Sequence, residues 1–491
     1  MRRSRLPVVA AVVGAVLGAL VLAAGPSHAQ TPSVAELQRE INRLQQQLNT
    51  LQGLDQKVQV LDKQVQTEQQ QQQTQAQQDQ RWRSELPAVA VNAQGLTVTS
   101  PDKDFTLRIH GLIQADGQFY SNGDDKTAPG GVTSSTFLLN RVRPIFDGTV
   151  SRNYDYHLEP DFGLGTTVLQ DAWVDAHPLG DAARFEAGKF KSPYGIERLQ
   201  QDTNLLFIQR GLTTNLIPNR DIGVQVHGGL LDQQLTYQLA LLNGVPNNTA
   251  SVDADTNDAK DFVGRLFAQP FKDSNIDLAR GLGVGFAGTY GDERGALSKY
   301  KTSGQATFFT YASAATAAGE HFRYSPQGYY YAGPFGLLAD YDDDTQRAVV
   351  HTAHSFKSGK ETVKYTTSDF ETFANHAWQV QAGFMLSGEN ESYYGVKPAH
   401  DFNPLEGGWG AWEAKARFGS LNVDSDVFKD KFASTASSAE SATEFGGGLN
   451  WYWSQNVKLD FEYLWTYFYK GATHGNRPGE GAFLTQAQIA F

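Results

Sequence analysis

The stretch Val457-Lys-Leu-Asp-Phe-Glu-Tyr-Leu-Trp-Thr-Tyr467 alternates between two kinds of side chain. Its odd positions, from Val457 to Tyr467, are all apolar or aromatic. The even positions include Lys458, Asp460, Glu462 and Thr466. Because successive side chains of a strand point to opposite faces of a sheet, this stretch predicts a β-strand with one apolar face and one charged face.

The same alternation recurs along the second part of the chain, in Phe105–Tyr120, Trp378–Leu386 and Trp412–Phe418. A soluble β-sandwich also alternates, but here the polar face is rich in charge and the apolar face gathers Trp and Tyr, as in a membrane barrel. The final segment ends on Phe491, which resembles the assembly signal of outer-membrane barrels. We therefore predict an all-β, antiparallel transmembrane barrel over residues 101–491, with about sixteen strands and with fourteen or eighteen as alternatives.

The composition agrees with a barrel and narrows the chemistry. The chain has 48 Gly, 29 Phe, 20 Tyr and 8 Trp in 491 residues, and no Cys, which excludes disulfides and thiolate chemistry. Its formal net charge of −12 argues against a nucleic-acid partner. For a pore, however, selectivity depends on the charges that line it rather than on the total.

The first residues predict export across the inner membrane. Arg2, Arg3 and Arg5 precede an apolar run from Val8 to Ala24, and Ser27-His-Ala29 follows. This order is typical of a secretory signal peptide, which we place at residues 1–29. A membrane anchor is the alternative, but the small residues directly after the apolar run favour cleavage. Export with a barrel predicts the outer membrane of a Gram-negative bacterium and contact with its lipid.

A second segment, residues 30–66, carries apolar residues at three-and-four spacing. Leu37, Leu44, Leu51, Val58 and Val65 keep one heptad position, while their partners change sides near residue 53. This pattern predicts an α-helical coiled coil with a register break. Residues 67–100 are first rich in Gln and then contain Pro, and we interpret them as an extension, helical or disordered, and a linker. Self-association into a trimer would cover the apolar stripe, although the sequence leaves the number of chains open.

Several motifs in the barrel region are more specific. They are Phe105–Asp116, Arg141–Thr149, Leu169–Asp175, Gly188–Arg198, Pro218–Gln225, Gly408–Glu413 and Gly448–Tyr452. Together and in this order they resemble the phosphate-selective porin O/P family. The resemblance implies a homotrimeric barrel of sixteen strands that passes inorganic phosphate, polyphosphate or other anions by passive diffusion. It also implies a constriction to which the third extracellular loop contributes, after the strand that ends near Lys191.

Seven basic residues are candidates for lining this pore and binding anions. By the resemblance, Arg141 and Arg210 match basic pore residues, and Arg198 stands where the family has Lys. Alternation independently places Arg141 and Arg143 on one face, and it makes Arg265 a further lumen candidate. The complete set is Arg141, Arg143, Lys189, Arg198, Arg210, Arg220 and Arg265. The facing of Lys189 stays open, because strict alternation groups it with Phe185 and Ala187 unless a bulge intervenes.

Arginine suits phosphate because its planar fork can bind two oxygens at once. The chain departs from the family at Thr203, which replaces a Lys, and at Asn140, which replaces an Arg. These departures leave two alternatives open: a general diffusion porin, or a structural protein whose barrel anchors a periplasmic coiled coil that contacts the cell wall. No G-x-S-x-G or H-E-x-x-H motif is present, and we predict no enzyme activity, no cofactor and no metal.

Overall fold

The computed structural model describes residues 33–121, 134–251, 258–358, 361–429 and 431–491. It divides the chain into two units, Met1–Glu85 and Leu86–Phe491. The predicted signal peptide lies outside the described residues. Among the helices in the described ranges, none combines the length and hydropathy needed to cross a membrane.

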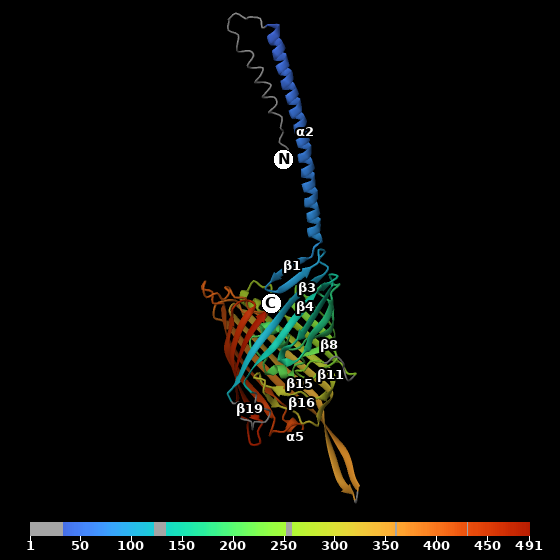
Figure 1. Cartoon of the computed structure of the whole chain (residues 1–491). Helices are drawn as coiled ribbons and strands as arrows, with labels where there is room; N and C mark the ends of the chain where they lie inside the picture. Colours follow the sequence, from blue (N-terminus) through green and yellow to red (C-terminus); the bar gives the residue numbers. More distant parts are fainter. Residues whose placement is uncertain (1–32, 122–133, 252–257, 359–360, 430) are drawn as a thin grey trace. The chain divides into compact units, whose positions relative to one another are not determined.

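The first unit contains one long helix, α2 (Val34–Glu85), seen as the blue ribbon in Figure 1. It begins with a capping box, because the Ser33 backbone N–H donates to Glu36 Oε2 at 3.0 Å and the Glu36 N–H donates to Ser33 Oγ at 3.4 Å. The helix continues through Gly53 and through the Gln-rich stretch, so the extension is helical. Its apolar stripe is exposed throughout the single chain, with Leu44 56% and Val58 52% exposed.

The second unit is a closed antiparallel barrel (Figure 1). Within the described residues, sixteen strands form its wall, which confirms the predicted barrel of about sixteen strands. They are β3 (Thr106–Tyr120), β4 (Thr136–Val150), β5 (Tyr154–Asp161), β6 (Val168–Ala176), β7 (Arg184–Lys191), β8 (Arg220–Leu230), β9 (Leu235–Leu242), β10 (Asp261–Ala268), β11 (Leu282–Ala296), β14 (Ala315–Ala332), β15 (Phe335–Ser358), β16 (Glu361–Met385), β17 (Ala411–Asn422), β18 (Ala439–Tyr452), β19 (Val457–Lys470) and β20 (Glu480–Ala490).

The barrel closes between its last and first strands. β20 pairs with β3 from Ala482↔Tyr120 to Ala490↔Leu112, and the Phe491 backbone continues the ladder by exchanging two hydrogen bonds with Gly111. The hairpin β1 (Ala88–Asn92) and β2 (Gly95–Thr99) then occupies the next part of the β3 edge, with Leu96 opposite Ile109. The C-terminal end of the predicted linker is therefore paired to the sheet, which leaves this edge of β3 covered.

The strand quoted first shows how the wall is built. In β19, Lys458, Asp460, Glu462 and Thr466 are buried inside the barrel, whereas Phe461, Tyr463 and Tyr467 on the other face are exposed. Exposed aromatic side chains together with buried charged ones are the reverse of the distribution found in a soluble protein. This distribution fits a wall with lipid outside and a polar lumen inside.

The connections at the two ends of the barrel differ in length. At the end of the barrel where β2 pairs with β3, several turns are short, as at 151–153, 231–234 and 453–456. At the other end, residues 192–219 join β7 to β8; we call them the inward loop. They contain α3 (Ile196–Leu199), η2 (Asp202–Asn204) and η3 (Leu212–Leu216). β15 and β16 also pair as far as Ser358↔Glu361, beyond the reach of β14 and β17, and project as a hairpin (Figure 1).

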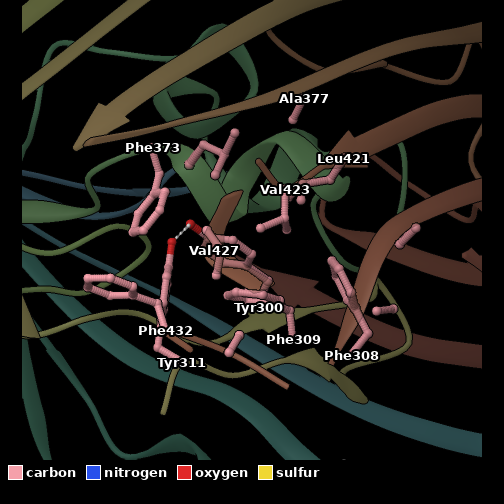
Figure 2. Packing of buried hydrophobic residues seen from close by; sticks show 14 of the residues in the cluster. Tyr300, Phe308, Phe309, Tyr311, Phe373, Ala377, Leu421, Val423, Val427 and Phe432 are labelled. Carbon is pink, nitrogen blue, oxygen red and sulfur yellow. Dashed lines mark hydrogen bonds between the residues drawn. The ribbon is translucent and has the colours of Figure 1, made fainter. Parts of the chain in front are cut away.

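An apolar cluster joins the inward loop to two other connections at the same end of the barrel. Figure 2 shows its aromatic side chains, from Tyr300 and Phe309 in the β11–β14 connection to Phe432 in the β17–β18 connection. Leu212 and Leu216 of η3 belong to the same cluster, and their side chains are 1% and 0% exposed. The hydrophobic effect therefore holds one end of the inward loop inside the barrel.

Candidate functional site

The inward loop lies within the lumen, because side chains from the opposite wall donate to its backbone carbonyl oxygens. Lys415 Nζ and Asn450 Nδ2 both donate to Leu206 O at 3.0 Å. The neighbouring contacts are Gln488 to Thr203 O at 3.1 Å, Lys458 to Leu205 O at 2.9 Å and Arg417 to Gln209 O at 2.9 Å. These donors lie on β17, β18, β19 and β20. The loop, which connects β7 to β8, therefore extends across the lumen to these strands and narrows the pore.

Apolar side chains of the same loop explain why it enters the barrel. Phe207 is 1% exposed and packs with Leu464 and Leu484 of the wall. Ile196 is fully buried in a separate cluster with Phe267 and Tyr329. A loop that carries such residues lowers its free energy by leaving water, at about 25 cal/mol per Å² of apolar surface buried.

Asp202 of the inward loop collects three of the predicted arginines. Its carboxylate lies 2.5 Å from Arg143 Nη1, 2.6 Å from Arg210 Nη2 and 3.5 Å from Arg141 Nε. Burial alone would raise the pKa of Asp202, but attraction by Arg141, Arg210 and Arg143 outweighs it and holds this pKa well below its ordinary value. The carboxylate is therefore charged and neutralises part of the basic cluster.

Two arginines of the wall are held by further carboxylates. Arg143 also contacts Glu159 and Asp161, both at 2.7 Å. Arg220 is the first residue of β8 rather than part of the loop, and it lies 3.0 Å from Asp171. Charge-assisted hydrogen bonds of this kind fix each guanidinium in one orientation, and the carboxylates reduce the net positive field.

Arg198 and Arg265 differ from the others, because no carboxylate of the described residues forms an ion pair with either. Arg198 donates to the amide oxygens of Asn219, at 3.2 Å, and Asn248, at 2.7 Å, and also contacts Thr214. Arg265 points to the lumen side of β10, where it donates to Gln238 at 3.1 Å and covers the Phe267 ring. Neutral partners leave the full positive charge of both side chains in the pore.

Lys189 has a different position. It lies opposite Ala172 and Ile222, whereas its neighbour Gly188 lies opposite Trp173, which stacks on His157 of the lumen. The register therefore puts Lys189 in the same row as Phe185 and Ala187, but Lys189 is 7% exposed whereas Phe185 is 47% exposed. Its ammonium donates to Ser251 O at 2.8 Å and is covered by the β9–β10 connection, so it does not join the arginine cluster.

A cavity of about 770 Å³ opens beside the inward loop on the side of the barrel that carries β2 and Phe491. Basic and acidic side chains alternate along its wall. The basic ones are Arg108, Arg143, Lys191, Arg220 and Lys458, and the acidic ones are Asp147, Asp155, Glu159, Asp171 and Asp202. The lumen is thus polar and nearly balanced in charge at this level.

Two groups in the described lumen have the composition of metal sites: His157 with Glu159 and Asp171, and His227 with Asp175 and Glu186. In each group one of the carboxylates already forms an ion pair with an arginine. Arg220 contacts Asp171 at 3.0 Å, and Arg184 contacts Asp175 at 2.8 Å. A metal ion would have to compete with these fixed positive charges.

Some residues of this site do not follow from the motifs. Lys415 and Arg417 were placed on the polar face of their strand by alternation, but nothing in the sequence indicated that they would hold the inward loop. Asp202 directly precedes Thr203, the position at which the resemblance to the family indicates that a Lys has been replaced. Its acidic character was visible in the sequence, and a search for counter-charges to the arginines would have found it.

A closed sixteen-stranded barrel with a lipid-compatible exterior, a charged lumen and an inserted third loop is an outer-membrane porin. More specifically, the family model of phosphate-selective porin O and P matches residues 108–491, and the chain belongs to this family. Membership in a family of channels confirms that the chain is not an enzyme.

Individual relatives are distant. Porin O of Pseudomonas aeruginosa is 23% identical over 427 residues, which cover 81% of this chain and 91% of that protein. Among solved structures, the outer membrane channel DcaP of Acinetobacter baumannii is similar over 82% of this chain and 100% of its own, with 10% identity and a TM-score of 0.50. An anion-selective porin from Comamonas acidovorans covers 79% of this chain and 100% of its own, with 10% identity and a TM-score of 0.46.

Proposed function

We propose that this porin passes small anions, with inorganic phosphate or polyphosphate as the physiological solute class. The observation that carries the proposal is the convergence of Arg141 and Arg143 of the wall and Arg210 of the inward loop on Asp202, with Arg198 and Arg265 left without ion-pair partners among the described residues. In a narrow, low-dielectric pore, fixed positive charges offset the cost of dehydrating an anion. Membership in a family described as phosphate-selective supports the same solute class.

The carboxylates around these arginines favour spaced, weak anion sites over one tight site. Release from the pore requires weak binding, and Asp202 and Glu159 weaken the attraction exerted by Arg143. A general diffusion porin is the second candidate, since the same carboxylates would produce it if they cancelled the arginine charge completely.

Replacing Arg198 and Arg265 together with Gln tests the proposal. In a planar bilayer with a KCl gradient, the reversal potential of the wild-type channel should show that chloride permeates better than potassium. Phosphate should partly block the chloride current. The double variant should lose most of this preference, because the two charges without ion-pair partners disappear while the paired arginines remain. Arg294→Gln is the matched control, since Arg294 is exposed and pairs with Asp292 on β11. Cation preference in the wild type would overturn the proposal, and no preference would favour general diffusion.

We further propose that α2 trimerises the protein in the periplasm, where it also reaches the cell wall. Support comes from its apolar heptad positions, which stay exposed in a single chain, and from the position of an N-terminus ahead of an even-numbered barrel. Removal of residues 34–80 should leave barrels that conduct but separate into monomers in detergent, as measured by analytical ultracentrifugation. Removal of residues 67–80 alone is the control, because it spares the apolar stripe. Stable trimers after the longer deletion would instead assign the helix to anchoring.

A further inference from the structure

Two buried carboxylates of the lumen wall have no basic partner. Asp340 and Asp342 lie on one face of β15, and they are 4% and 0% exposed. Neither forms an ion pair within the described residues, and none of their four oxygens has a hydrogen-bond partner there. Asp344, two residues further along the same face, shows the usual arrangement, since it contacts His321 at 2.5 Å and Arg323 at 3.7 Å.

Two buried carboxylates cannot both stay ionised without a counter-charge. Each buried carboxylate costs several kcal/mol unless it is paired, and the two repel one another at close range. Two remedies are available: the carboxylates share a proton, or they bind a cation. The groups around them distinguish these remedies.

The surroundings supply oxygen atoms. The hydroxyls of Tyr194 and Ser325 lie beside Asp342, and the hydroxyl of Thr213 lies beside Asp340. All three side chains are fully buried, and none of their hydroxyl oxygens has a hydrogen-bond partner among the described residues. The Gln379 amide also lies beside Asp340. Carboxylate, hydroxyl and amide oxygens are the donor types that a hard cation prefers.

We propose that Asp340 and Asp342 bind a Ca²⁺ ion between β15 and the inward loop. Ca²⁺ accepts six to eight oxygens in irregular geometry, which suits four carboxylate and three hydroxyl oxygens. Mg²⁺ demands an octahedron and retains its waters, so it fits a dry site less well.

The ion would join parts of the chain that are far apart in sequence. Tyr194 lies near the start of the inward loop, Thr213 lies in η3 of the same loop, Ser325 lies on β14, and the two carboxylates lie on β15. Binding would therefore fasten both halves of the loop to β14 and β15, in addition to the contacts that Lys415 of β17 and Lys458 of β19 make with it. The ion adds a structural role to the loop, and this role does not depend on which solute passes.

The test uses the full chain in detergent, stripped of metal with EDTA and dialysed against Ca²⁺. Elemental analysis should find one more Ca²⁺ per chain in the wild type than in the Asp340→Asn/Asp342→Asn double variant. Asp369→Asn is the matched control, because Asp369 is exposed on the β15–β16 hairpin. Tb³⁺ should replace Ca²⁺ and emit on excitation of tyrosine, since Tyr194 lies at the site, and Tyr194→Phe should reduce this emission.

Thermal unfolding separates the cation from a shared proton. Ca²⁺ should raise the melting temperature of the wild type and of Asp369→Asn, whereas the double variant should not respond. Equal Ca²⁺ content in the wild type and the double variant, or an EDTA-treated wild type that melts as the Ca²⁺-loaded one does, would overturn the proposal. In that case Asp342→Asn alone, which mimics a protonated carboxyl, should leave the melting temperature unchanged.

Discussion

Asp202→Asn is expected to make the channel more selective for anions and less stable. The substitution removes the one carboxylate that Arg141, Arg143 and Arg210 share, so the positive potential of the constriction rises. Loss of one partner from a buried ion-pair cluster costs about 3–5 kcal/mol, and the inward loop should unfold at a lower temperature. Both effects are measurable, as a more anionic reversal potential and as a lower melting temperature in detergent.

The control for this variant is Asp369→Asn, which removes an equal charge from the exposed hairpin outside the lumen. It should change neither quantity. If Asp202→Asn left the reversal potential unchanged, the permeating ions would not sense the arginine cluster, and the selectivity site would lie elsewhere in the pore.

Lys415→Met is expected to give the second large effect. The Lys415 ammonium is fully buried between Asp460 and Glu462, and it also donates to Leu206 O of the inward loop. Methionine has a similar shape but no charge, so Asp460 and Glu462 lose their closest counter-charge and Leu206 O keeps only the hydrogen bond from Asn450. We expect a destabilisation of about 3–5 kcal/mol and a shift of the reversal potential toward cations.

A lysine outside the lumen provides the comparison. Lys364 is exposed on β16 in the projecting hairpin, and Lys364→Met should behave as the wild type. Release of the loop would also widen the pore, so single-channel conductance should increase in Lys415→Met alone. An unchanged conductance and melting temperature would mean that the apolar contacts of Phe207 hold the loop without this ion pair.

The opposite shifts in reversal potential expected for these two variants, and the loss of stability expected for both, reflect one property of the lumen. Acidic side chains hold the arginines near Asp202, and basic side chains hold the loop carbonyls on the far wall. Most charges therefore have a mechanical role as well as an electrostatic one. The net field that an ion experiences is a small difference between large contributions, and it depends strongly on residues such as Arg198 that remain unpaired.

Alternation along the strands was sufficient to predict the barrel, because the facing of a side chain in a strand depends only on its position along the chain. The charged face of Val457–Tyr467 and the apolar end at Phe491 are local features, and both occupy the predicted positions. Arg141 and Arg143 share a face in the structure for the same reason. The ordered motifs predicted the family, and the match over residues 108–491 confirms it.

Pairing between distant segments was not accessible in this way. Lys189 has the right residue type, but its ammonium donates to Ser251 O of the β9–β10 connection and does not join the arginine cluster. Leu206 meets Lys415, and Asp202 meets Arg143, only because the inward loop folds across a closed barrel. The sequence by itself determined which faces are apolar and which are charged. Only the tertiary structure decided which charges neutralise one another, since Coulomb energy depends on distance and burial rather than on order along the chain.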